Sequence, residues 1–150
     1  MKNPGHEDCR AKIRALTEGE TDEVALMATI ACELYHHFDR FDWVGFYRVT
    51  EPGLMKIGPY QGGHGCLVIP FNRGVCGHCA TTKETVIVPD VDAFPGHIAC
   101  ACSTRSEIVL PVWRKGELIA VLDVDSDAPD NFDAHDRAEL EAMLEEAFAT

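Results

Sequence analysis

The sequence predicts an α+β domain built around an antiparallel sheet. Residues 107–113 and 117–124 are apolar runs separated by Arg114-Lys115-Gly116, a pattern typical of an antiparallel hairpin. Helical segments are expected before and after the strands, without the regular strand-helix alternation that would indicate a parallel sheet. A length of 150 residues with 46% hydrophobic residues fits one domain with a substantial core.

Two helices are expected at the N-terminus and one at the C-terminus, about residues 8–39 and about 134–148. A short helix should cover residues 8–16, and a longer one should follow Thr21 as its N-cap. Asp133 should cap the last helix. The longer N-terminal helix carries an apolar face at helical spacing, formed by Met27, Ile30, Ala31, Leu34 and Phe38.

The sheet and the candidate site are expected between about residues 42 and 125. A strand over 42–49 should present Trp43, Gly45 and Tyr47 on one face and Val44, Phe46 and Arg48 on the other. Shorter strands are expected at 54–57, 67–70 and 86–88, with a helix beginning near Val75. Because no repeat, low-complexity tract or linker divides the chain, residues 1–150 are interpreted as one domain.

The amino-acid composition limits which cellular compartment and which classes of binding partner are expected. Seven cysteines could form a disulfide framework, but the N-terminus is polar and lacks a secretory signal, so a reducing cytosol is expected. No apolar run approaches the roughly 18 residues of a membrane helix. A net charge of −12 argues against nucleic-acid binding, which leaves small molecules or proteins as partners.

Cys76-Gly-His-Cys79 is the obvious local cysteine motif. A thiol near a helix N-terminus has its thiolate favoured by the helix dipole. A thioredoxin-like site would need a βαβ context that is absent, so Cys79 is preferred as a small, semi-buried helix residue. Structural zinc is a minority alternative, because Cys-Ala-Cys is shorter than the usual ligand spacing. Its candidate ligands would be Cys76, Cys79, Cys100, Cys102, His64, His78 and His97.

Cys100 follows Phe94-Pro-Gly-His-Ile-Ala, a segment that reads as a loop shaped by Pro95 and Gly96. Loop thiols are accessible, and loops carry reactive groups more often than buried elements do. The alternative is a small buried residue, since Ile98 and Ala99 precede it.

Asp123 and Asp125 lie two residues apart on a predicted strand, so their carboxyl groups should project from the same face. If the pair is partly buried, one carboxyl could hold a proton near neutral pH and act as an acid. Glu107, on the neighbouring strand of the hairpin, could join them across the sheet. The alternative is an exposed pair of acids at a strand end.

Residues 58–112, with Cys66, Cys76 and Cys100 at their particular spacing, followed by GELIAVLDVDS, closely resemble the free methionine-(R)-sulfoxide reductases, which are single GAF domains. The resemblance implies a GAF-like, six-stranded antiparallel sheet flanked by helices and a homodimer. It implies that Cys100 is the catalytic thiol and that Cys66 and Cys76 are resolving or recycling cysteines. It also implies a substrate site formed by Glu107, Asp123, Asp125, Trp43 and Tyr47.

The implied reaction is reduction of free methionine-(R)-sulfoxide through a Cys100 sulfenic acid and an intramolecular disulfide, recycled by thioredoxin without a cofactor or a metal. Two features depart from the family pattern. Ala101 stands where an Asp is usual, and Cys79 and Cys102 are additional. Either additional thiol could compete for the sulfenic acid. The main rival interpretation is a GAF sensor or binding module that holds a ligand without turning it over.

Overall fold

The computed structural model describes residues 5–98 and 103–149. Within these ranges the chain forms an α+β fold with a six-stranded antiparallel sheet, in the strand order β3-β2-β1-β6-β5-β4. The fold class predicted from the sequence is therefore confirmed. In chain order the elements are α1 (Gly5–Leu16), α2 (Glu23–His37), β1 (Trp43–Glu51), β2 (Leu54–Gln61), β3 (Val68–Pro70), α3 (Gly74–Thr82), β4 (Val86–Val88), the 3₁₀ turn η1 (Val91–Ala93), β5 (Ser106–Arg114), β6 (Glu117–Ser126) and α4 (Ala134–Ala147).

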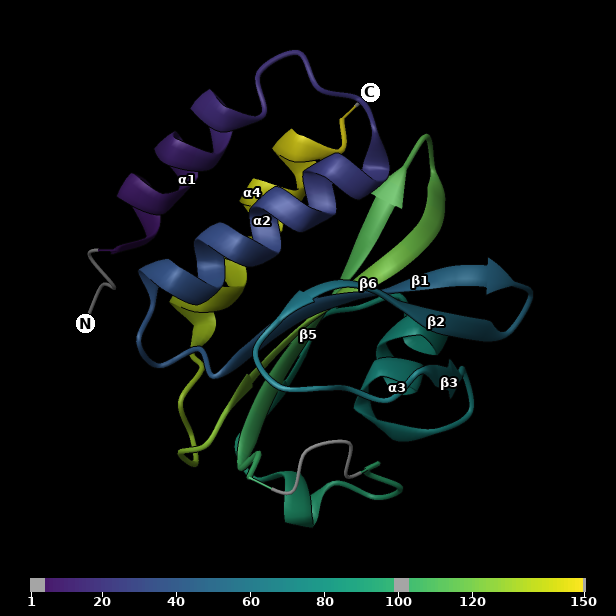
Figure 1. Ribbon diagram of the computed structural model, residues 1–150. Coiled ribbons are helices and arrows are strands. Elements are labelled where there is room, and N and C mark those ends of the chain that lie inside the picture. Colours follow the sequence, from purple (N-terminus) through teal and green to yellow (C-terminus); the bar gives the residue numbers. More distant parts are fainter. Residues whose placement is uncertain (1–4, 99–102, 150) are drawn as a thin grey trace.

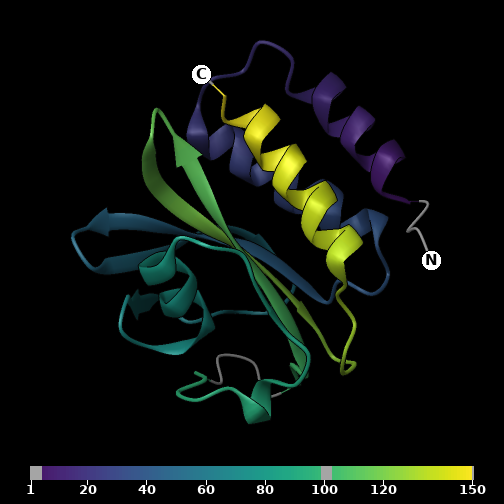
Figure 2. The same ribbon diagram turned by 180° about the vertical axis from the view of Figure 1, so that it is seen from behind.

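The helices lie on both sides of the sheet. Helices α1, α2 and α4 gather on one side, whereas α3 lies on the other side beside the segment that carries η1 (Figures 1 and 2). The larger hydrophobic cluster joins α1, α2 and α4 to one sheet face, and a smaller cluster joins α3 to the opposite face. Inside the ranges described, no helix is both long and apolar enough to cross a membrane.

The apolar face predicted for α2 is confirmed, because all five of its residues are buried in the larger cluster. The predicted cap is wrong by one residue. Asp22, not Thr21, caps the helix by accepting a hydrogen bond from the Ala25 amide at 3.0 Å. Both side chains can cap a helix, and the structure places the β-region backbone at Asp22.

The hairpin of β5 and β6 is confirmed, with Leu110 opposite Leu122 in its register. Strand β1 alternates as predicted, since Val44 and Phe46 belong to the larger cluster and Trp43 and Tyr47 to the smaller one. Strand β2 is longer than the predicted 54–57.

An irregularity lets β2 continue past Gly58-Pro59. The pairs Gly45–Tyr60 and Tyr47–Ile57 leave only Phe46 opposite two residues of β2. Such a bulge accommodates a proline inside a strand, because the local ladder of hydrogen bonds is already interrupted. Gly58-Pro59 therefore interrupts the sequence pattern of a strand, although the strand itself continues through these residues.

A buried charged cluster fastens α1 to the start of α4. His6 lies 2.8 Å from the Asp136 carboxylate, and Arg40 donates to the same carboxylate. Asp136 also completes a capping box with Asp133. Burial alone would raise the pKa of Asp136, but the hydrogen bonds from His6, Arg40 and the backbone outweigh it and hold that pKa below its ordinary value.

We predict that Asp136→Asn lowers the free energy of unfolding by about 3 kcal/mol, because it leaves the buried partners of the carboxylate unpaired. The loss should diminish as the pH falls, since a depressed acid pKa contributes stability only above the pKa of the folded state. Urea denaturation at several pH values would measure both effects.

Glu146→Gln provides the matched control, because it breaks a surface ion pair with Arg14 on the same two helices. It should cost less than about 1 kcal/mol. Equal losses in the two variants would contradict the role given to the buried cluster.

Candidate active site

A pocket opens on the sheet face that α3 covers. It contains about 490 Å³ of space between atoms, including its opening to solvent. Its walls combine the strands β1, β3, β5 and β6, the first turn of α3 and two loops. The residues that line it are Trp43, Tyr47, His64, Gly65, Ile69, Gly74, Val75, Cys76, His97, Ile98, Thr104, Glu107, Asp123 and Asp125.

Three acidic side chains meet in this pocket because of the register of the sheet. Glu107 is paired with Asp125 across β5 and β6, and Asp123 lies two residues before Asp125 on the same face. The predicted convergence of the three acids is thus confirmed. Asp123 is 5% exposed and Asp125 is only partly exposed, which excludes the alternative that these two acids form a solvent-exposed pair at a strand end.

The three acids lie too close together in the pocket to carry a charge at the same time. Asp123 makes side-chain hydrogen bonds with Glu107 and Asp125, and two carboxyl groups can share a hydrogen bond only if one is protonated. Burial first, and then the charges of the neighbouring acids, raise the pKa of Asp123 and Asp125 well above the ordinary range. The folded pocket therefore holds protons more tightly than exposed carboxyl groups do.

Two carboxyl oxygens of this cluster are left without partners. The Oδ1 atoms of Asp123 and Asp125 are buried and accept no hydrogen bond from the described part of the chain. Buried polar atoms without partners are uncommon in folded proteins and call for a specific explanation. A bound group that donates hydrogen bonds would satisfy both atoms.

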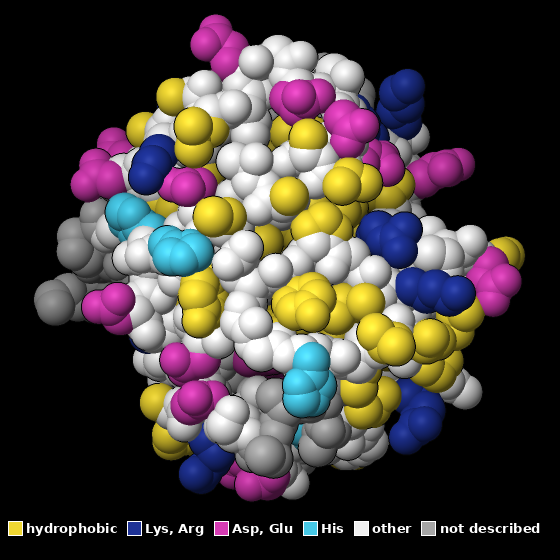
Figure 3. All heavy atoms as spheres, viewed as in Figure 1, with side chains coloured by type: hydrophobic (Ala, Val, Ile, Leu, Met, Phe, Trp, Pro, Cys, Tyr) yellow, Lys and Arg dark blue, Asp and Glu magenta, His cyan; other side chains and the backbone are white. Residues whose placement is uncertain are grey.

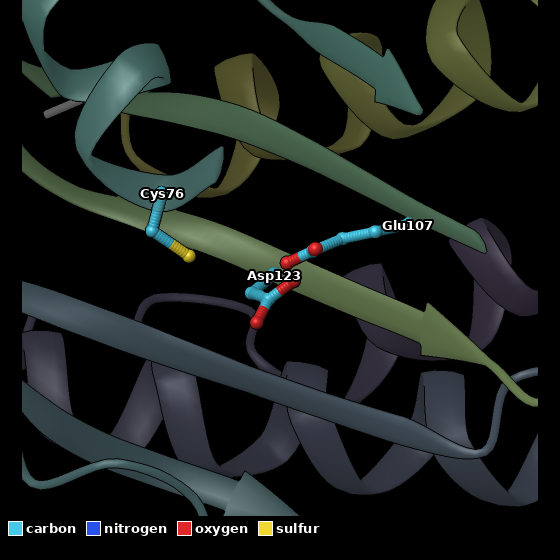
Figure 4. Close-up of side chains that lie close together, drawn as sticks. All are labelled: Cys76, Glu107 and Asp123. Atoms are coloured by element: carbon cyan, nitrogen blue, oxygen red, sulfur yellow. The ribbon is translucent and has the colours of Figure 1, made fainter. Parts of the chain in front are cut away.

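Cys76 places its thiol beside the acids from the first turn of α3 (Figure 4). The prediction that the helix dipole favours its thiolate is wrong. Burial, and then the charges of Asp123 and Glu107, raise the pKa of Cys76 well above the ordinary range. A dipole effect of about 0.3–1 kcal/mol is smaller than the cost of ionising a buried thiol next to two acids.

Cys79 is a free thiol with no exposed surface, and burial raises its pKa to about 12. It is even more deeply buried than the semi-buried helix residue preferred from the sequence. A thiol so protected is a poor nucleophile.

Two aromatic residues of β1, Trp43 and Tyr47, form an aromatic wall of the pocket. The indole of Trp43 stacks on Tyr60 and Tyr47 at ring distances of 5.4 and 6.0 Å, and its Nε1 donates to the Gly63 carbonyl at 2.7 Å. A Cβ atom at Gly45 would lie 2.4 Å from Trp43 Cη2, so the ring can lie flat only over a glycine. Trp43 and Tyr47, the aromatic residues expected from the family resemblance, both line this pocket, and their role toward a substrate stays a prediction.

Cys66 lines the edge of the smaller cluster and is disulfide-bonded, whereas the other described cysteines are free thiols. Cys100, the predicted nucleophile, and Cys102 lie outside the described residues. The chain enters the intervening segment at Ile98 and leaves it just before Thr104, and both of these residues line the pocket.

Several pocket residues were not assigned to the site from the sequence. Thr104 was missed altogether, and His64 was considered only as a zinc ligand. His97 was expected to supply polarity, and its Nε2 lies 4.0 Å from a Glu107 oxygen. All three belong to loops, whose placement depends on the packed sheet and not on a local repeat of apolar residues.

The face of the molecule drawn in Figure 3 carries apolar side chains. Hydrophobic side chains gather over the region of β2 and β3 (Figure 3). The large apolar side chains exposed on these two strands and on the loop between them are Tyr60, Leu67 and Val68.

Comparison with known proteins defines the class first. Residues 22–149 match the GAF domain family, so the chain belongs to the GAF-domain proteins. GAF domain-containing protein A of Dictyostelium discoideum is 42% identical over 143 residues, which are 95% of this chain and 90% of that protein.

The particular family follows from two further relatives. The free methionine-R-sulfoxide reductase of Escherichia coli is 38% identical over 152 residues, covering 99% of this chain and 92% of that protein. The X-ray structure of the Neisseria meningitidis free methionine-R-sulfoxide reductase in complex with its substrate is 41% identical, with a TM-score of 0.89 over 96% of this chain and 88% of that one. The chain belongs to the free methionine-R-sulfoxide reductase family, as its motifs predicted.

We predict that Gly45→Ala lowers the free energy of unfolding by about 1–3 kcal/mol, because the new methyl group displaces the Trp43 ring. Urea denaturation would measure the loss. Gly63→Ala is the matched control, since a Cβ there meets no atom within 4 Å. An equal effect in both variants would refute the close packing of Trp43 over Gly45.

We predict that Asp123→Asn stabilises the fold at pH 8. When the pKa of an acid is raised in the folded state, the folded state holds the proton more tightly than the unfolded state does. The free energy of unfolding of the protein therefore falls as the pH rises above the unfolded pKa of that acid. Replacing the ionisable carboxyl group should raise the free energy of unfolding at pH 8 by about 1.4 kcal/mol or more, which corresponds to a pKa difference of one unit. Thermal or urea unfolding between pH 5 and pH 9 should show a flatter profile.

Glu117→Gln is the control for this measurement, because Glu117 is an exposed acid on the same strand. It should leave the pH profile unchanged. If Asp123→Asn retained the full pH dependence of the unaltered protein, the buried acids would not store protons as described.

Proposed function

We propose that the protein is a thiol-dependent reductase that converts free L-methionine-(R)-S-oxide to L-methionine. The observation that carries the proposal is the buried acidic cluster, which faces an aromatic wall in one pocket of a chain 38–41% identical to reductases of this substrate. A free amino acid carries an ammonium group, and a pocket rich in carboxyl groups is complementary to it.

The pocket offers a partner for each part of the substrate. The unpartnered Oδ1 atoms of Asp123 and Asp125 can accept hydrogen bonds from the ammonium group. The first turn of α3, which lines the pocket at Gly74 and Val75, presents amide groups and a positive dipole end to a carboxylate. The Trp43 ring suits the methyl and thioether end, since a sulfur–aromatic contact contributes about 0.3–1.5 kcal/mol.

The proposed reaction begins with attack of the Cys100 thiolate on the electrophilic sulfur of the sulfoxide. A protonated acid of the cluster donates a proton to the sulfoxide oxygen, a role that the raised pKa of Asp123 and of Asp125 favours. The oxygen moves to Cys100 as a sulfenic acid, and methionine leaves. In sum, one thiol and one sulfoxide become one sulfenic acid and one thioether.

The thiol is then restored in two exchanges. A second cysteine attacks the sulfenic acid, which forms a disulfide and releases water, and an external dithiol such as thioredoxin reduces that disulfide. Cys66 is a suitable resolving residue because it already takes part in a disulfide, and Cys76 is a reserve thiol. Of the two additional cysteines, Cys79 is too deeply buried to compete, which leaves Cys102. We include a homodimer in this proposal on the family resemblance.

We predict thioredoxin-coupled turnover of free methionine-(R)-sulfoxide that falls by roughly a thousandfold or more in Cys100→Ser, because the nucleophile is removed. Oxidation of NADPH by a thioredoxin recycling system would report the rate. Cys32→Ser is the matched control, since Cys32 lies on α2, which packs against the opposite sheet face.

The S epimer and a peptide-bound sulfoxide complete the experiment. The peptide lacks the free ammonium group that the acids are proposed to bind, so it should react poorly. Absence of turnover with the free R substrate, in reduced and metal-free protein, would overturn the proposal and favour a GAF module that binds a ligand without changing it.

A further inference from the structure

Three potential metal ligands converge at the acidic end of the pocket. The Cys76 sulfur and one carboxyl oxygen each from Glu107 and Asp123 all lie within 4.8 Å of one another. The side chains point toward one another from α3, β5 and β6 (Figure 4). Because three separate elements hold them, the group is not the result of neighbouring positions in the sequence.

Within the described residues, the ion pair recorded for this cluster is the 4.0 Å approach of His97 Nε2 to a Glu107 oxygen, and none is recorded for Asp123. All three residues are at least nine-tenths buried, and the Oδ1 atom of Asp123 has no hydrogen-bond partner there. Buried ionisable groups of this kind must be protonated, paired or bound to a metal. A cation can take the place of protons, since metal binding to thiols and carboxyl groups releases them.

The donor types select the class of cation. Magnesium and calcium bind oxygen ligands, whereas a thiolate among oxygen donors suits zinc and its thiophilic relatives. Zinc bonds of roughly 2.0–2.3 Å would draw the three atoms slightly together and leave a fourth position open. The His97 ring, 4.0 Å from Glu107, lies where it can support a ligating carboxylate.

We propose that Cys76, Glu107 and Asp123 bind a zinc-class divalent cation in the reduced protein, and that this cation inhibits by occupying the acidic end of the pocket. The inhibition rests on the proposed function, because the cation would hold the acids assigned there to the substrate. It would also cover Cys76. The binding of the cation itself does not depend on any turnover.

The binding test is a titration of reduced, chelator-treated protein with Co²⁺, a spectroscopic substitute for zinc. One equivalent should produce thiolate-to-cobalt absorption, and added Zn²⁺ should abolish it. The absorption should vanish in Cys76→Ser. The affinity for Co²⁺ should fall by about 10- to 100-fold or more in Glu107→Gln and in Asp123→Asn. Losing a group that only supports a metal ligand already costs this much, and losing a ligand should cost at least the same.

Cys79→Ser is the matched control, because Cys79 is a buried thiol one turn along the same helix and is not part of the cluster. It should bind Co²⁺ as the unaltered protein does. Circular dichroism would confirm that each variant is folded. Lack of thiolate-to-cobalt absorption in the unaltered protein would overturn the proposal, and so would absorption that persists in Cys76→Ser or affinity that is unchanged in both acid variants.

The inhibition is tested separately in the turnover assay. Zn²⁺ should raise the apparent KM for the free sulfoxide, because cation and substrate compete for the same acids. A protein that binds Co²⁺ as described but shows no turnover would refute the proposed function and leave the metal site standing. Turnover that is insensitive to saturating Zn²⁺ would refute the inhibition.

Discussion

Three carboxyl groups buried on one face of a sheet impose the constraint around which this site is organised. Glu107, Asp123 and Asp125 are too close to be ionised together, so the folded protein must supply protons or admit a positive group. Burial, and then the charges of these acids, also raise the pKa of Cys76, and two carboxyl oxygens of the cluster are left without partners among the described residues. Two chemically different groups could supply the positive charge. One is the ammonium group of a ligand, and the other is a divalent cation.

Such a cluster is costly for stability, and the rest of the fold compensates. The larger hydrophobic cluster lies on the opposite face, where α1, α2 and α4 cover the central strands. The cluster of His6, Arg40 and Asp136 fastens two of these helices together. The acids are therefore held in place by a backbone whose stability is supplied elsewhere, which is how preorganised sites are commonly built.

Much of this arrangement was predictable because strands alternate with a period of two. That rule alone assigned Trp43 and Tyr47 to one face, and it brought Asp123 and Asp125 together. The rule could not give the register that sets Glu107 opposite Asp125, nor the bulge that extends β2 past Gly58-Pro59. Local signals were also insufficient where two effects compete, as for the thiol of Cys76, whose burial outweighs the helix dipole. Thr104 was missed because a loop residue has no periodic signal.

The two clusters share the strands but not the side chains. On β6, Leu122 and Val124 face the larger cluster while Asp123 and Asp125 face the pocket, so adjacent positions in the chain serve different tasks. Substitutions at alternate positions can thus reshape the pocket and leave the main core intact. This separation makes the scaffold evolvable. A lineage could exchange one amino-acid-sized ligand for another through a few odd-numbered positions of a single strand, without acquiring a new fold.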